Sequence, residues 1–122
     1  MAMLAVLPIG LLLLDAQGAI EEANPAAPRV LGLKGAPRTL DELHGRILDP
    51  VTGEAVALGD LPWQRALRGE RVEDLDLLLA VPSPTERRLI TVSGLPFHDP
   101  GASAAGALIM VVDRVSFLLR AA

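Results

Sequence analysis

Three short runs of consecutive apolar residues constrain the fold of this chain most strongly. They occupy residues 11–14, 77–81 and 108–112. A strand with one face in water alternates apolar and polar side chains, so an uninterrupted apolar run predicts a strand that is covered on both faces. Short helices of the same chain would cover one face. We expect a partner, or the chain's own ends, to cover the other, because a bare patch of several hundred Å² promotes aggregation.

The composition favours one folded domain. The chain has 122 residues, of which 51% are hydrophobic and 21% are charged. A disordered chain needs low hydrophobicity and a large charge imbalance, so this composition excludes disorder. A chain of this length suits a single core.

Charge and cysteine content exclude several classes of partner and site. With 11 Lys and Arg against 15 Asp and Glu, the net charge is −4, and only one Trp and two Phe could stack on bases. Nucleic acid is therefore a poor partner. The sequence contains no Cys, which excludes disulfides, thiolate zinc sites, iron–sulfur clusters and a cysteine nucleophile. We expect a cytoplasmic location.

The apolar N-terminus is not expected to span a membrane. No Lys or Arg precedes the run at residues 1–14, which ends at Asp15 and is broken by Pro8 and Gly10. A spanning helix needs about 20 apolar residues. We predict an N-terminal cap or flanking helix over residues 1–8, followed by a buried strand. A shortened membrane anchor is the alternative.

Turn residues and apolar patterning predict the order of the elements. Strands are expected over residues 11–14, 19–22, 72–81, 87–97 and 106–112. Asn24 and Pro25 begin a short helix over residues 26–31, one helical turn is expected at 39–43, and a two-turn helix at 63–67 ends before Gly69. Two strands, several short helices and three strands make an antiparallel α+β layout.

Four segments, taken in this order, resemble the PAS domains of bacterial sensors. They are LPIGLLLLDAQGAIEEANPAAPRVLG (residues 7–32), LPWQRALRGERVEDLDLLL (61–79), ERRLITVSGLPFHD (86–99) and GALIMVVDRV (106–115). The resemblance implies a five-stranded antiparallel sheet of order 2-1-5-4-3, with short helices on one face that enclose a small pocket. The PAS domain would span residues 9–115, and residues 116–122 would begin a C-terminal connector. Ser83, Pro84 and Thr85 replace the family's frequent Asp-Gly turn, which predicts the loss of a tight hairpin.

The resemblance also implies a regulatory function without catalysis. PAS domains are input modules of histidine kinases, phosphatases, cyclic-nucleotide enzymes and transcription regulators. A sensory domain of this kind would bind a small apolar ligand or act through dimerisation, and would pass its signal to a C-terminal effector domain. A ligand-free architectural interaction module is the alternative.

The sequence offers little for a cofactor, a metal ion or an active site. His44 and His98 lie in different loops, outside the helix that carries the axial His in haem-binding PAS domains, and two His without Cys fall short of a zinc site. The absence of Cys excludes LOV-type photochemistry, and apolar strands make flavin an unlikely ligand. We find no Gly-x-Ser-x-Gly elbow and no Gly-x-Gly-x-x-Gly loop, so we expect no enzyme. A run of acids could suggest a cation site, but alternating acids along a strand are typical of a solvated face: Glu70, Glu73, Asp74 and Asp76. Alternatively, Glu70 pairs at the surface with a nearby arginine such as Arg68 or Arg71.

Two sets of residues are candidates for function. The first would line a pocket under the helices, with a filled core as the alternative: Ile47, Trp63, Leu67, Leu78, Ile90, Val92 and Met110. The second would join the uncovered sheet face in a homodimer, with a monomer capped by its own termini as the alternative: Met3, Leu4 and Leu7.

Overall fold

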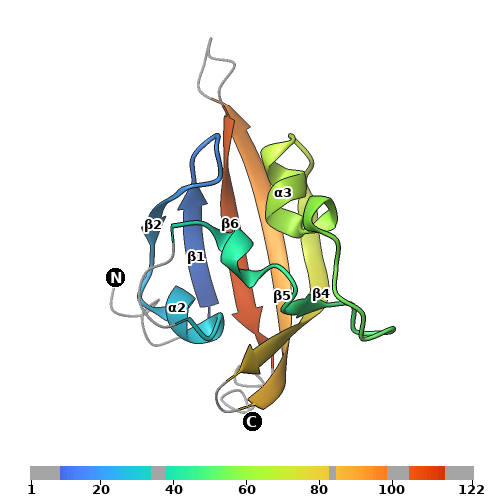
Figure 1. Ribbon diagram of the computed structural model, residues 1–122. Coiled ribbons are helices and arrows are strands. Elements are labelled where there is room, and N and C mark those ends of the chain that lie inside the picture. Colours follow the sequence, from blue (N-terminus) through green and yellow to red (C-terminus); the bar gives the residue numbers. More distant parts are fainter. Residues whose placement is uncertain (1–8, 34–37, 83–84, 99–104, 115–122) are drawn as a thin grey trace.

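A single antiparallel sheet organises the computed structural model, which describes residues 9–33, 38–82, 85–98 and 105–114 (Figure 1). Its strands are listed here in chain order: β1 (Ile9–Leu14), β2 (Ile20–Ala23), β3 (Ile47–Leu48), β4 (Val72–Pro82), β5 (Thr85–His98) and β6 (Ala105–Asp113). The order across the sheet is β2-β1-β6-β5-β4-β3. The five strands predicted from the sequence lie in the predicted order. The α+β class and the PAS-like layout are therefore confirmed.

The sixth strand, β3, extends the edge of the sheet beyond the prediction. It pairs with β4 through Ile47 opposite Leu79 and Leu48 opposite Leu78. Two residues are too few to show a period of two, so the sequence pattern could not reveal this strand.

The connection between β4 and β5 corrects a further expectation. Pro82 pairs directly with Thr85 across the two strands, so only residues 83 and 84 connect them. The departure from Asp-Gly therefore does not lengthen this hairpin, and the prediction that it would be lost is wrong.

Short helices cover one face of the sheet, which we call the inner face (Figure 1). They are α2 (Ala26–Val30), the 3-10 turns η1 (Leu40–Leu43) and η2 (Leu58–Asp60), and α3 (Pro62–Leu67). Pro62 opens α3 as its first residue, where the missing N–H of proline costs nothing. Helix α2 packs on β1 and β6, whereas α3 packs on β4, β5 and β6.

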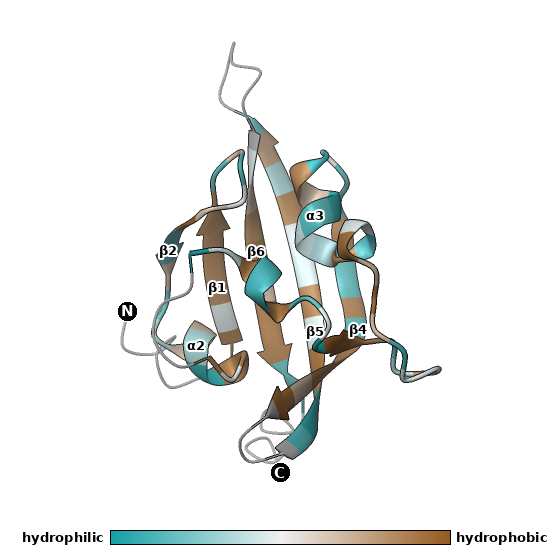
Figure 2. Ribbon diagram, in the orientation of Figure 1, coloured by the Kyte–Doolittle hydropathy of each residue, from teal (hydrophilic) through white to brown (hydrophobic). Residues whose placement is uncertain are grey.

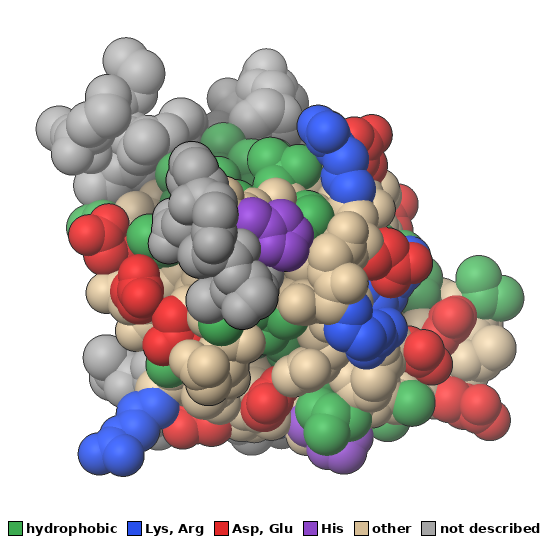
Figure 3. Space-filling model, turned by 90° about the horizontal axis from the view of Figure 1, so that it is seen from above, with side chains coloured by type: hydrophobic (Ala, Val, Ile, Leu, Met, Phe, Trp, Pro, Cys, Tyr) green, Lys and Arg blue, Asp and Glu red, His purple; other side chains and the backbone are tan. Residues whose placement is uncertain are grey.

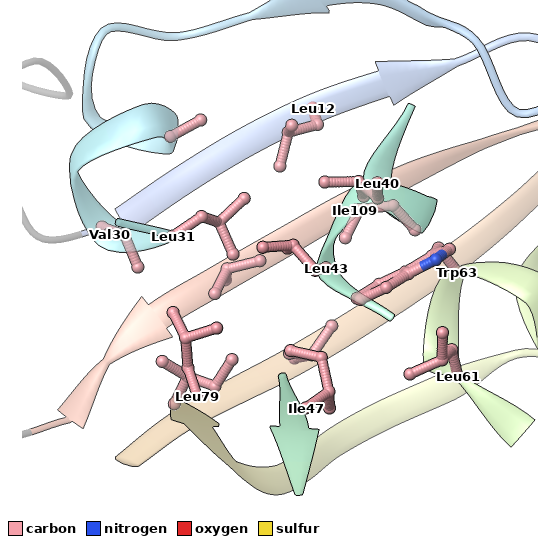
Figure 4. Packing of buried hydrophobic residues seen from close by; sticks show 14 of the residues in the cluster. Leu12, Val30, Leu31, Leu40, Leu43, Ile47, Leu61, Trp63, Leu79 and Ile109 are labelled. Carbon is pink, nitrogen blue, oxygen red and sulfur yellow. The ribbon is translucent and has the colours of Figure 1, made fainter. Parts of the chain in front are cut away.

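One hydrophobic cluster fills the space between the helices and the inner face (Figure 4). Alternate strand residues point into it, and Figure 2 shows mainly hydrophobic colouring on β1 and β6 and mixed colouring on β4 and β5. The strands contribute Leu12, Leu14, Leu77, Leu79, Ile90, Val92, Ile109 and Val111, and the helical segments contribute Val30, Leu31, Leu40, Leu43, Leu61 and Trp63.

Close packing of β1 against α2 depends on Gly10. A Cβ atom at this position would lie 2.9 Å from the Cα atom of Ala27. Glycine in a strand often marks such an approach of two backbones. Because Gly10 has no side chain and Ala27 has only a methyl group, α2 can pack directly on the sheet.

Candidate functional site

The predicted pocket residues divide between the two faces of the sheet. Ile47, Trp63, Ile90 and Val92 are buried in the inner-face cluster, and Leu67 is half-buried against it. The structure therefore brings five of the seven candidates together under the helices.

Leu78 and Met110 were wrongly assigned to the inner face. Their strand neighbours Leu77, Leu79, Ile109 and Val111 are buried in the core, and successive strand residues point to opposite faces. Both side chains are half-buried on the other face. An unbroken apolar run does not show which of its residues point inward. Only the pairing register of the strands shows this.

An exposed carboxylate joins two of the helical segments above the core. Asp41 Oδ1, in η1, accepts hydrogen bonds from Trp63 Nε1 at 3.2 Å and from Gln64 Nε2 at 2.8 Å. Trp63 is only 1% exposed, so Asp41 gives a buried indole its acceptor. This contact ties η1 to α3 across the layer that covers the inner face.

The opposite face of the sheet, which we call the outer face, carries an apolar centre. The pairing of β6 with β1 and β5 places Leu108 between Leu13 and Leu95. In the next row of the same face, Leu11 of β1 lies opposite Met110 of β6. The three large hydrophobic residues that remain most open on this face are 38% to 40% exposed: Leu95, Phe97 and Leu108. Figure 3 looks from above onto the end of the sheet, so this face is seen edge-on; hydrophobic, acidic and basic side chains are mixed at that end.

A groove of about 320 Å³ opens where β2, β1 and β6 adjoin. Leu11, Leu13, Leu108, Glu22 and Asn24 are among its lining residues. Its walls are mainly apolar, with Glu22 as the one charged side chain among the lining residues. The groove therefore offers mainly apolar surface together with one carboxylate and one amide.

Asn24 fixes the backbone beside this groove. Its Oδ1 accepts from the backbone N–H of Leu11 at 3.0 Å and of Ala27 at 3.1 Å, and its Nδ2 donates to the carbonyl of Ile9 at 2.9 Å. One side chain thus joins β1 to the first turn of α2. The sequence predicted Asn24 as a helix start, but gave no sign of its bonds to β1.

A polar cluster interrupts the apolar outer face beside the end of β6. Thr91 Oγ1 donates to Asp76 Oδ1 at 2.6 Å, and Arg114 Nη1 donates to Thr91 Oγ1 at 3.1 Å. The sequence places Asp76 among the acids of a solvated face and gives no sign of its contacts with Thr91 and Arg114. One sequence feature could have indicated the cluster: Thr91 is a polar residue between the apolar residues Ile90 and Val92.

The ion pair of Glu70 differs from the prediction. Its partner is Arg65, with Nε 2.7 Å from Oε2, whereas Arg71 pairs with Glu73. The hydrogen bond from Arg65 lowers the pKa of Glu70, and the same bond raises the pKa of Arg65. Arg68 instead donates to the carbonyl of Gly59. The turn that ends α3 brings Arg65 back to Glu70, which sequence spacing did not indicate.

The two histidines lie apart on the surface. His44 follows η1 and His98 ends β5, and both are exposed. In the described part of the chain, no three His, Asp or Glu side chains are grouped so that they could hold a metal ion. No helix within the same residues is both long enough and apolar enough to cross a membrane.

Known proteins share both the sequence pattern and the fold. A family model described as PAS fold matches residues 4–116. The alginate biosynthesis sensor protein KinB of Pseudomonas aeruginosa is 32% identical over an alignment of 122 residues. That alignment covers 92% of this chain but only 19% of KinB.

Two solved PAS domains show the same fold. One belongs to the nitrogen regulation protein NR(II) of Vibrio parahaemolyticus, with 23% identity, a TM-score of 0.56, and coverage of 92% of this chain and 94% of that chain. The other belongs to an HTR-like protein of Haloarcula marismortui, with 21% identity, a TM-score of 0.58, and coverage of 92% and 91%. Since the family match extends over almost the whole chain, this protein belongs to the PAS-fold family.

Proposed function

We propose that this PAS domain is a non-catalytic regulatory module that associates with a second copy through its outer face. The observation that carries the proposal is the apolar centre of that face, where Leu95, Phe97 and Leu108 stay 38% to 40% exposed. A signal would favour one arrangement of the paired sheets over another, which is a shift between existing populations.

The relative KinB suggests where the signal would go. KinB is named as a sensor protein, and this chain spans only 19% of it. We propose that an effector domain, such as a histidine kinase, a phosphatase or a transcription regulator, follows the connector at residues 116–122. The cytoplasmic location expected from the cysteine-free sequence is part of the same proposal.

A second copy suits the outer face because the patch has an apolar centre and charged surroundings. Leu13, Leu108 and Leu95 form a continuous row across three strands, while Glu22 lies at one side and Asp76 at the other. Protein interfaces typically combine a desolvated apolar centre with a polar rim. In a twofold dimer the same patch serves both partners. Met3, Leu4 and Leu7, which lie outside the described residues, stay proposed contributors.

Sedimentation velocity tests the dimer. We expect the wild-type chain to become dimeric as its concentration rises through the micromolar range, and Leu108→Asp to keep it monomeric by placing a charge in the apolar row. Leu58→Asp is the matched control, because Leu58 is 43% exposed on η2 rather than on the sheet. A wild-type chain that stays monomeric at high micromolar concentration would refute the dimer, and so would equal effects of the two substitutions.

The inner-face residues support a second candidate, a pocket for a small apolar ligand. Ile47, Trp63, Ile90 and Val92 belong to one buried apolar cluster, and Leu67 packs against it. Native mass spectrometry of the purified chain tests this candidate. A retained small molecule that is lost in Val92→Trp would support ligand binding, whereas a mass equal to that of the chain alone would support the architectural module.

A further inference from the structure

We propose that Asp76, Thr91 and Arg114 form a latch that holds the residue directly after β6 against the outer face of the sheet, shortly before the proposed C-terminal connector begins. This inference rests on the proposed function, because it supposes that the connector carries the output. The latch would have to open before the connector could change its direction relative to the sheet.

The contacts of the latch extend across three strands. Thr91 lies in β5, opposite Asp76 of β4 and Val112 of β6. Arg114 directly follows β6, and its Nη1 atom reaches 3.1 Å from Thr91 Oγ1 and 3.8 Å from Asp76 Oδ1. The residue that leaves the last strand is therefore bound to the middle of β5 and to β4.

The central hydroxyl gives the latch its specificity. A threonine hydroxyl has one proton to donate and two lone pairs to accept with. Donating to Asp76 at 2.6 Å leaves it free to accept from Arg114. Thr91 is 6% exposed and is the one buried polar residue among those described. The side chains of Asp76 and Arg114 are 54% and 43% exposed, and an ion pair this open contributes little by itself.

The adjacent pair on the same two strands shows what is specific to the latch. Ser93 Oγ lies 3.4 Å from Asp74 Oδ1, and the N–H of Asp74 donates to Ser93 Oγ at 3.1 Å. Two hydroxyl–carboxylate pairs therefore lie between β4 and β5: Thr91 with Asp76, and Ser93 with Asp74. Only the pair nearest the end of β6 has an arginine bound to its hydroxyl in the described structure.

The end of β6 is held on the inner face as well. Asp113 Oδ2 lies 3.9 Å from Nε of Arg88, whose Nη1 donates to the carbonyls of Arg29 and Val30 at the end of α2. The consecutive residues Asp113 and Arg114 therefore bind to opposite faces of the sheet, Asp113 to the inner face and Arg114 to the outer face. Opening the latch would release the outer attachment and leave the inner one.

Site-directed spin labelling tests the latch directly. The chain contains no cysteine, so Ser116→Cys provides a single attachment site two residues after Arg114. In this labelled chain we expect Thr91→Val and Arg114→Gln each to narrow the electron paramagnetic resonance lines, because the label becomes more mobile. The control Ser93→Ala should leave the spectrum unchanged. Trp63 fluorescence should stay native in every variant.

Two results would overturn the latch. One is an unchanged spectrum in both Thr91→Val and Arg114→Gln while Trp63 fluorescence stays native. The other is equal narrowing in Ser93→Ala, which would assign the effect to general loosening of β4 and β5. Sedimentation of the labelled chain without further substitution separates the two proposals: a dimer, with unchanged spectra in Thr91→Val and Arg114→Gln, refutes the latch alone, and a monomer, with narrowed lines in these variants, refutes the dimer alone.

Discussion

Trp63 joins the most deeply buried part of the molecule to its surface. Its ring is enclosed by the inner-face cluster, while its N–H reaches the exposed carboxylate of Asp41 in η1. Since Trp63 is the one tryptophan of the chain, its fluorescence reports on the core without interference from another indole.

We expect Asp41→Ala to destabilise the fold by about 1–3 kcal/mol, because it leaves the buried indole N–H without an acceptor. Urea unfolding followed by Trp63 fluorescence measures this loss. Glu42→Ala is the control, since Glu42 is exposed in the same turn and its carboxylate accepts no described bond from Trp63. Equal midpoints for Asp41→Ala and wild type would show that water replaces the carboxylate.

The pair of Arg65 and Glu70 predicts a dependence on pH. The pKa of Glu70 is lower in the folded chain because it accepts a hydrogen bond from Arg65. A lowered folded-state pKa stabilises the fold above the unfolded-state pKa, and this contribution is lost as the pH falls through the folded-state value.

We therefore expect Glu70→Gln to lower the melting temperature slightly at pH 7 and to have no effect once the wild-type carboxyl is protonated in acid. Thermal melts at both pH values, with and without high salt, measure the difference. A larger effect of Glu70→Gln in acid than at pH 7 would contradict this assignment.

At the scale of elements, Asn24 joins β1 to α2. Its side chain forms hydrogen bonds with three backbone groups, two in β1 and one in α2. Gly10 leaves room for α2 beside it. The position of α2 on the sheet therefore depends on two neighbouring residues of different kinds, one polar and one without a side chain.

Asn24→Ala should weaken this junction by about 1–3 kcal/mol, because the Leu11 N–H and the Ile9 carbonyl lose their side-chain partner, while the Ala27 N–H keeps its 3.1 Å bond to the backbone carbonyl of residue 24. Hydrogen exchange at the Leu11 amide should accelerate more than at Val92, in the centre of β5. Asn24→Asp is the matched variant, since it keeps the acceptor for both amides and loses only the donor to Ile9. Equal exchange in Asn24→Ala and wild type would exclude this role.

The helices and strands also show which parts of the fold could be predicted from the sequence. Five strands, α2, η1 and α3 were predictable because turn residues mark their ends, and apolar runs also mark β1, β4 and β6. The strand β3 was not, since Ile47 and Leu48 are too few to form a pattern. In residues 77–81 every side chain is apolar, so only the pairing with β5 shows that Leu78 points outward. The latch escaped prediction because its contacts depend on the pairing register of β4, β5 and β6, which the sequence pattern does not give.

At the scale of the whole molecule, one cluster connects every layer. Residues from five strands, α2, η1 and α3 contribute to it. Among the described strands, only β2 has no residue buried in this cluster. Its residue Ile20 packs against the cluster instead.

We expect this single cluster to unfold in one cooperative transition. Urea curves recorded by Trp63 fluorescence, which reports on the core, and by far-UV circular dichroism, which reports on the strands, should have the same midpoint. Two separate midpoints would show that the sheet survives the loss of the helical layer, which would contradict one shared core.

The neighbouring positions of β1 and β6 have a consequence for longer polypeptides. Ile9 begins the first strand opposite Val112, near the end of the last, so the chain enters and leaves this unit at adjacent points. A unit built in this way can be inserted into a long polypeptide while the segments before and after it stay side by side. Duplication or exchange of such a cassette between genes would alter what a protein responds to and would barely change the span between its neighbours.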